Sequence, residues 1–202
     1  MKKRFLAYST GLIKKYYPDT DSIKMEEYAY NLEGFYLTMS KMLVIIPIAI
    51  ILGVIKELVI LLLAFNLIRE QAHGLHASKS WICLLSSTII FIGVPLIAKN
   101  IEIPFTYRII LEVIGLVLIV IYAPADTVKA PIIKKKVRIK LKIKSIICTL
   151  IIIIVSLFIK DTTISNLMVF AIWIATLLIL PITYKIFNLP YNNYINYLKN
   201  MN

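Results

Sequence analysis

Long apolar runs separated by short polar stretches make up most of this chain from about residue 35 onward. A membrane-spanning helix needs about 20 mostly apolar residues, because each residue rises 1.5 Å and the hydrocarbon core is about 30 Å thick. The pattern predicts an all-α, polytopic membrane protein with about six transmembrane helices. The predicted spans are Phe35–Ile55, Leu58–Ile68, Lys79–Ala98, Pro104–Tyr122, Ile143–Ile159 and Thr163–Tyr184. The breaks "IKEL", "KNIEIP" and "KDTT" predict tight hairpins.

Residues 1–34 have a different pattern, in which a basic first segment is followed from Ile23 by mixed apolar and acidic positions. Such segments are typical of amphipathic helices that lie on a membrane surface. The opening "MKKRF" is not followed by the continuous apolar core or the small-residue cleavage site of a signal peptide, so we expect it to be retained. We therefore predict a single integral membrane domain over 1–202, with an N-terminal segment 1–34, membrane helices within 35–187 and a C-terminal tail 188–202.

Composition supports this class. Hydrophobic residues make up 59% of the chain and the mean hydropathy is +0.82, whereas soluble domains are usually about 45–50% apolar. A soluble enzyme is therefore excluded.

The basic residues indicate an orientation. Lys and Arg are retained in short cytoplasmic loops, and they concentrate in two places, the first 24 residues and the run from Lys129 to Lys144, whereas each predicted hairpin carries a single Lys. With six spans, both clusters lie on one side and all hairpins on the other. We expect cytoplasmic termini and a cytoplasmic loop at Arg69–Lys79.

That loop holds the main candidate chemistry, "REQAHGLHASKSWIC" from Arg69 to Cys83. A cysteine thiol becomes a strong nucleophile when an imidazole takes its proton. His76 and Cys83 are seven residues apart, which is about 10.5 Å in an unbroken helix and too far for a hydrogen bond. The chain must turn between them if they cooperate, and Gly74, Ser78 and Ser80 supply breaks before the third span settles into a helix. Cys148 lies within an apolar run and is most simply a small buried hydrophobe.

These residues resemble a known family. Arg69, Gly74, His76, Ala77 and Cys83 stand in the places of the signature of the AgrB family, the membrane peptidases of accessory gene regulator quorum sensing. The segment "YAPADTVKAPI" is similar to a second family segment. The departure is His73, where the family commonly has the first of two glycines.

The resemblance implies a cysteine endopeptidase that cleaves a short, amphipathic, AgrD-like propeptide. It implies Cys83 as the nucleophile and His76 as the general base. The N-terminal part of the substrate is held as a thioester on Cys83 until an internal cysteine or serine attacks it and releases a thiolactone or lactone. It also implies a homodimer. The Ile- and Lys-rich composition indicates a bacterial source, so we expect a bacterial cell membrane.

Other members of the site have two interpretations each. Arg69 stabilises a carboxylate or an oxyanion, or is a loop cation whose stem lies along the membrane. Glu70 orients His76 or pairs with Arg69, and Gln71 donates to the oxyanion or is an exposed amide. Asp126 is the third member of a triad, or a loop cap before Thr127.

Two further patterns contain candidate metal ligands or paired charges. His73, His76 and Cys83 could bind zinc, but the only further candidate ligands are scattered carboxylates and the chain has no HExxH motif, so we expect no metal and no cofactor. Arg108 and Glu112 are four residues apart within a predicted span, which favours an ion pair on one helix face.

The basic loop predicts anionic partners. Five of its residues are candidates for binding anionic lipid or an acidic peptide tail: Lys129, Lys134, Lys135, Lys136 and Arg138. We expect no nucleic acid partner for a membrane-embedded loop. A transporter or a non-catalytic peptide-docking subunit is the competing class, and it predicts that replacing Cys83 is silent.

Overall fold

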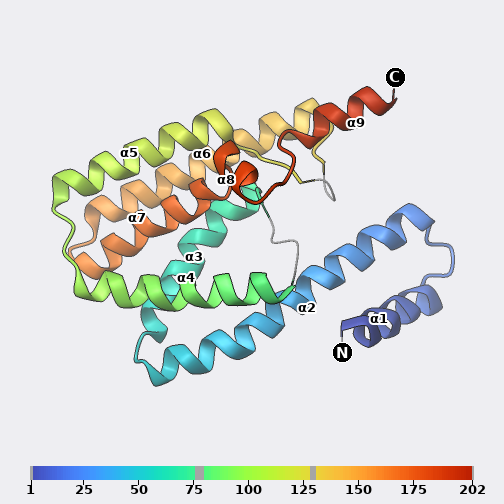
Figure 1. Cartoon of the computed structure of the whole chain (residues 1–202), viewed down its shortest axis with the longest axis horizontal. Helices are drawn as coiled ribbons and strands as arrows, with labels where there is room; N and C mark the ends of the chain where they lie inside the picture. The colour runs from blue at the N-terminus through green and yellow to red at the C-terminus, as the bar shows by residue number, and fades with distance from the viewer. Residues whose placement is uncertain (1, 76–79, 128–130, 202) are drawn as a thin grey trace. The chain divides into compact units, whose positions relative to one another are not determined.

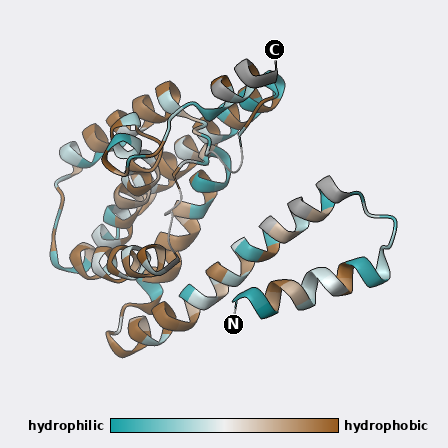
Figure 2. Cartoon of the chain, turned by 45° about the vertical axis from the view of Figure 1, so that its right-hand side comes forward, coloured by the Kyte–Doolittle hydropathy of each residue, from teal (hydrophilic) through white to brown (hydrophobic). Residues whose placement is uncertain are grey.

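The computed structural model describes residues 2–75, 80–127 and 131–201, and their regular structure is helical (Figure 1). The helices run as follows: α1 Lys2–Tyr16, α2 Ser22–Ile51, α3 Ile55–Ala72, α4 Ser80–Asn100, α5 Phe105–Tyr122, α6 Lys135–Phe158, α7 Thr162–Leu177, α8 Pro181–Ile186 and α9 Asn193–Met201. Figure 2 shows apolar residues along the helix bodies and hydrophilic residues at many helix ends. The all-α membrane class expected from the sequence is confirmed.

The chain divides into two compact units, residues 1–48 and 49–202. In the first unit, α1 and the first part of α2 form a hairpin. The Lys2 ammonium lies 2.7 Å from the Glu33 carboxylate, and the rings of Phe5 and Tyr36 are 5.2 Å apart. The described residues of α1 include no buried side chain, as expected for a helix that lies on a surface.

The second unit is built around α3, which packs against α4, α6 and α7, while α5 packs against α6 and α7. The buried side chains of α3 recur at helical spacing, including Leu58, Leu61, Phe65 and Ile68. Close approach of α5 to α7 depends on Gly115, since a Cβ there would lie 2.5 Å from Ile172 Cγ2. Small residues allow such backbone contacts between membrane helices.

Polar contacts join the three predicted hairpins at one end of this unit. The Lys99 ammonium lies 3.5 Å from the Glu57 carboxylate and donates to the Gly53 carbonyl, and Lys56 lies 4.0 Å from Asp161. Asn166 donates to the Ile101 carbonyl at 2.8 Å. The connections after α3, α5 and α7 therefore share the opposite end.

The number of spans differs from the prediction. Four helical segments of the described chain are long and apolar enough to cross a membrane: Asn31–Ile51, Trp81–Asn100, Phe105–Tyr122 and Lys135–Phe158. The predicted second span corresponds to α3, which is 18 residues long but carries charges near both ends. The predicted sixth corresponds to α7, a shorter apolar helix. The expected continuation to Tyr184 is wrong, because the helix ends at Leu177 and Pro181 begins α8 after a turn.

The ion pair expected between Arg108 and Glu112 does not form. Both side chains are buried, with 9% and 1% of their surface exposed. The guanidinium lies 5.5 Å from the centre of the Phe105 ring, while Glu112 faces Ser156 of α6. Each charged group therefore has a neighbour other than its helical partner.

Candidate active site

The turn after α3, His73–Leu75, is the described part of the site nearest to the predicted general base. The helix ends at Ala72 because the next two residues have positive φ angles, 55° at His73 and 110° at Gly74. The His73 N–H still donates to the Arg69 carbonyl at 3.0 Å, and the chain then leaves the helix axis. Of the three expected breaks, the one at Gly74 is present, Ser78 lies outside the described residues, and Ser80 is the first residue of α4.

Arg69 holds this turn from within α3. Its guanidinium donates to three successive carbonyls, those of His73, Gly74 and Leu75, and the Nη2 distances to the last two are 3.0 and 2.7 Å. The planar fork of donors on arginine suits several acceptors at once. In the described structure, Arg69 therefore fixes the backbone that leads into residue 76, a role that neither sequence interpretation included.

Two other segments hold the same turn from outside. The Gly74 N–H donates to the Ala125 carbonyl at 2.9 Å, and the Ala125 N–H donates to the Ala72 carbonyl at 3.0 Å. The Leu75 N–H donates to the Leu178 carbonyl at 2.9 Å. The connections after α3, α5 and α7 thus meet at one backbone junction (Figure 1).

His73 occupies a backbone conformation, φ 55° and ψ −136°, that glycine adopts much more readily than other residues. The departure from the two glycines of the AgrB signature therefore leaves a glycine-type turn in place.

Replacing His73 with glycine should stabilise the protein by about 1 kcal/mol, because it removes backbone strain. Thermal unfolding in detergent measures this change. A lower melting temperature would contradict the proposed strain.

Burial and the neighbouring Arg69 guanidinium lower the pKa of His73 below its ordinary value of 6.5, against a smaller rise from the Glu70 backbone. His73 therefore binds a proton less tightly in the folded than in the unfolded chain, so it makes folding less favourable as the pH falls below about 6.5.

We expect the melting temperature to depend less on pH between pH 7 and 5 in His73→Asn than in wild type, because asparagine does not titrate there. Asparagine also tolerates the positive φ of this position. An unchanged dependence would contradict this.

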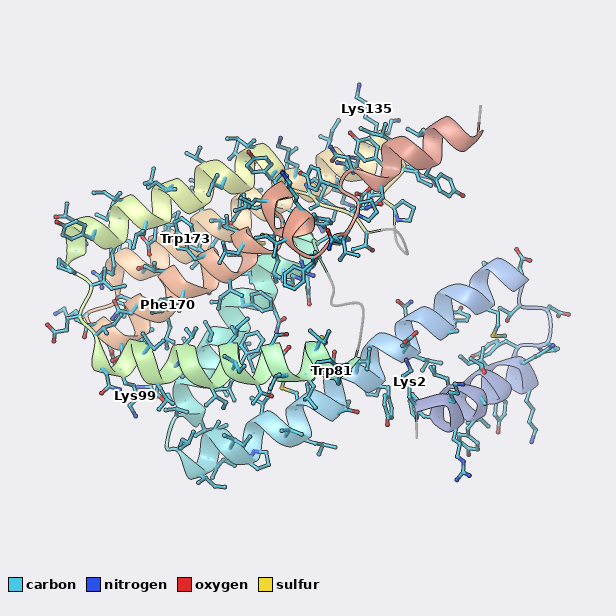
Figure 3. The ribbon with its side chains drawn as sticks, viewed as in Figure 1. Lys2, Trp81, Lys99, Lys135, Phe170 and Trp173 are labelled. Atoms are coloured by element: carbon cyan, nitrogen blue, oxygen red, sulfur yellow. The ribbon has the colours of Figure 1, made fainter. Side chains whose placement is uncertain are left out.

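Cys83 is the fourth residue of α4 and is half-buried. Figure 3 shows Trp81 at the same helix end, and 63% of its surface is exposed. The predicted base, His76, lies outside the described residues, which stop at Leu75 and resume at Ser80. The closeness of His76 to Cys83 therefore stays a prediction. The described residues on either side of His76 are the turn that ends at Leu75 and the helix that carries Cys83.

Glu70 and Gln71 follow Arg69 in the last turn of α3. Glu70 is exposed and Gln71 is half-buried. Their roles toward His76 or an oxyanion stay predictions.

Asp126 lies just beyond the backbone junction and is 2% exposed. Its carboxylate accepts from the N–H groups of Asn193 and Tyr194 at 3.0 and 2.9 Å, and it lies 3.5 Å from the Arg138 guanidinium. The carboxylate therefore caps the start of α9. These partners are 67 and 68 residues away along the chain, so no local sequence pattern indicates them. A direct role of Asp126 on the imidazole stays a prediction.

The basic candidates lie in different surroundings. Lys134, Lys135 and Lys136 are exposed at the start of α6, where Figure 3 shows Lys135 projecting from the helix. Arg138 instead turns inward to Asp126 and donates to the Pro124 carbonyl at 3.3 Å. Lys129 lies outside the described residues.

Within the described ranges, no three His, Cys, Asp or Glu side chains gather as metal ligands would. The zinc alternative includes His76, so these ranges do not test it.

The fold and the site define a multi-pass, all-α membrane protein with a cysteine at the start of one helix and, at the end of the preceding helix, a backbone junction fixed by an arginine. Residues 8–180 match the family Accessory gene regulator B. The chain belongs to this family.

Individual relatives agree with this assignment. The chain is 42% identical over 142 residues to accessory gene regulator protein B of Staphylococcus aureus strain bovine RF122 / ET3-1, which covers 70% of this chain and 75% of the relative. It is 38% identical over 141 residues to the protein of the same name in strain Newman, covering 70% and 74%. It is 29% identical over 179 residues to an AgrB-like protein of Clostridium acetobutylicum, covering 88% and 85%. No solved structure matches the chain.

Proposed function

We propose that this protein is a membrane cysteine endopeptidase of accessory gene regulator quorum sensing. Its substrate is a short amphipathic propeptide, and its product is a cyclic thiolactone or lactone. Cys83 is the nucleophile and His76 is the general base. The cleavage site faces the cytoplasm, on the same side as the basic N-terminal segment and the basic start of α6.

The observation that carries this proposal is the segment from Arg69 to Cys83. It holds the residues of the family signature and lies inside the matched range 8–180. Its described part is a turn in which three consecutive carbonyls accept from Arg69 and two N–H groups donate to other loops. Such restraint suits a catalytic loop, because a misplacement of about 1 Å can cost a factor of 100 in rate.

The chemistry proceeds in two acyl transfers. The Cys83 sulfur attacks the scissile carbonyl carbon while His76 takes the thiol proton. His76 then gives this proton to the departing amine, so the C-terminal fragment leaves and a thioester forms. An internal thiol or hydroxyl of the substrate attacks the thioester, which closes the ring and returns the proton to Cys83.

The start of α4 suits the oxyanion of these steps. The first N–H groups of a helix have no acceptor within that helix, and they favour negative charge. In α4 these include the N–H groups of Trp81 and Ile82, directly before the proposed nucleophile. We propose that these two N–H groups donate to the oxyanion of the tetrahedral intermediate, a role for which the sequence offered Arg69 or Gln71.

The exposed lysines at the start of α6 suit an anionic partner. Lys134, Lys135 and Lys136 precede the apolar part of that helix, at the end that the charge pattern predicts to be cytoplasmic. We propose that they hold an acidic part of the propeptide or anionic lipid headgroups. A homodimer, which the family resemblance suggests, is part of the same proposal.

The test is cleavage of the cognate propeptide by purified protein in lipid vesicles, with the fragments identified by mass spectrometry. The proposal expects a cyclic peptide and a released C-terminal fragment. Transport of uncut peptide across the vesicle membrane, with no fragments, would instead support the transporter class.

A further inference from the structure

The C-terminal segment is fixed to the core at one carboxylate. Asp126 accepts from the first N–H groups of α9, with 3.0 Å from the Asn193 nitrogen to Oδ1 and 2.9 Å from the Tyr194 nitrogen to Oδ2. A carboxylate at a helix N-terminus satisfies unpaired donors and is favoured by the helix dipole. Here the capping residue comes from a distant connection, so the cap also joins α9 to the loop after α5.

Arg138 strengthens the same contact. Its guanidinium carbon lies 3.7 Å from the centre of the Tyr194 ring, and its Nη1 lies 3.5 Å from the Asp126 carboxylate. Its Nη2 donates to the Pro124 carbonyl at 3.3 Å. One arginine on α6 therefore contacts both the loop after α5 and α9.

The backbone of Asp126 is held as firmly as its side chain. The Tyr184 hydroxyl donates to the Asp126 carbonyl at 2.9 Å, and the Asn193 amide donates to the same oxygen at 3.4 Å. Tyr184 is 1% exposed, and burial raises the pKa of its hydroxyl, so the hydroxyl stays a donor at neutral pH. We call Asp126, Arg138, Tyr184, Asn193 and Tyr194 the Asp126 clamp.

A single residue, Ala125, connects the clamp to the turn that leads to the proposed base. Ala125, adjacent to Asp126, accepts from Gly74 at 2.9 Å and donates to Ala72 at 3.0 Å. Gly74 and Leu75 are the last described residues before His76. The path from α9 to this turn thus consists of the carboxylate contacts, one peptide unit and a pair of backbone hydrogen bonds.

We propose that the Asp126 clamp makes α9 a positioning element for the catalytic turn. This inference rests on the proposed function and adds to it that the C-terminal helix, through Asp126, sets the position of His73–Leu75 and so the geometry of His76 toward Cys83. Asp126, Arg138 and Tyr194 are positioning residues, since they act through Ala125 and Gly74 and not on the substrate.

The experiment compares Asp126→Asn and Tyr194→Ala with wild type and with Tyr197→Ala. Asp126→Asn keeps the size of the side chain but removes the charge that Arg138 faces. Tyr194→Ala removes the ring beside Arg138 and leaves the backbone N–H. Tyr197 is an exposed tyrosine on the same helix, 46% accessible, so its replacement is the matched control. Wild type and every variant are full-length and reconstituted in lipid nanodiscs.

Two readouts are taken besides cleavage. Hydrogen exchange reports protection of the amides in residues 70–75 and 190–198. Alkylation of Cys83 between pH 5 and 9, followed by peptide mass spectrometry, reports assistance by His76, with His76→Ala as the reference for lost assistance. We expect Asp126→Asn and Tyr194→Ala to lose protection in both segments, to shift the alkylation profile toward that of His76→Ala, and to cleave about tenfold to a hundredfold more slowly. Tyr197→Ala should match wild type in every readout.

The outcomes separate this inference from the proposed function. If α9 loses protection while residues 70–75 and the alkylation profile stay as in wild type, the positioning role is wrong and catalysis by Cys83 and His76 is untouched. If the profile of wild type already equals that of His76→Ala, the proposed thiol and imidazole pair fails first. Tyr194→Ala keeps the test informative if Asp126→Asn does not fold.

Discussion

Replacing Cys83 with alanine is expected to abolish propeptide cleavage, with a loss of at least about 10⁴-fold, because no thioester can form without the thiol. Cys148→Ala is the matched control. It removes the other cysteine of the chain, which lies half-buried within α6. Cleavage of the propeptide in vesicles, with melting temperatures as a check of folding, measures both variants.

The two histidines extend the same test. His76→Ala should lose cleavage as Cys83→Ala does, whereas His73→Gly should retain it, since His73 serves the turn through its backbone. Cleavage that survives Cys83→Ala would contradict the thiol mechanism. Equal loss on replacing either histidine would revive the zinc alternative.

Replacing Gly74 with alanine is expected to have the largest effect on the fold of the site. Gly74 has φ 110°, and a Cβ there would lie 2.5 Å from both the Leu178 carbonyl oxygen and Arg69 Nη1. The arginine end can shift, but Leu178 O is backbone and accepts the hydrogen bond from Leu75. We expect a loss of stability of about 3 kcal/mol, from strain together with the broken junction, and a loss of cleavage.

Gly93→Ala is the control for this prediction. Gly93 lies inside α4, and an added Cβ would have no neighbour within 4 Å. Alanine there should stabilise the helix by about 0.5–1 kcal/mol. Thermal unfolding of both variants in the same detergent measures the contrast. A Gly74→Ala protein as stable as wild type would contradict the tight junction.

The positions of the helices were largely predictable, because long apolar runs between charged stretches are typical of membrane-spanning helices. The predicted helix ends were wrong where charge or apolar character does not coincide with the end of the helix. Basic residues concealed the first turns of α6, which begins at Lys135 and not Ile143. Apolar residues on both sides of Pro181 concealed the end of α7. Hydropathy alone locates neither boundary, because basic residues lower it where α6 is already helical and apolar residues keep it high beyond the end of α7.

The site was predictable only in part. The motif from Arg69 to Cys83 is contiguous, so its spacing indicated a turn at Gly74 and a possible thiol site. The partners of Arg69 are backbone carbonyls, and those of Asp126 are backbone N–H groups in α9. Every residue has a backbone carbonyl, and nearly every residue has a backbone N–H, so the amino-acid types do not indicate which of them serve as partners. Helical periodicity relates nearby positions only, and not positions 67 residues apart. Such contacts require the folded structure.

The most direct test of the central claim is to trap the acyl-enzyme. A propeptide whose internal cysteine or serine is replaced by alanine cannot close the ring, so its N-terminal fragment should accumulate on the enzyme. The account predicts that intact-mass and peptide mass spectrometry find this fragment on Cys83, and that neutral hydroxylamine, which cleaves thioesters, releases it. Cleavage of that substrate with no fragment on Cys83 at any time, including after rapid acid quenching, would contradict the account.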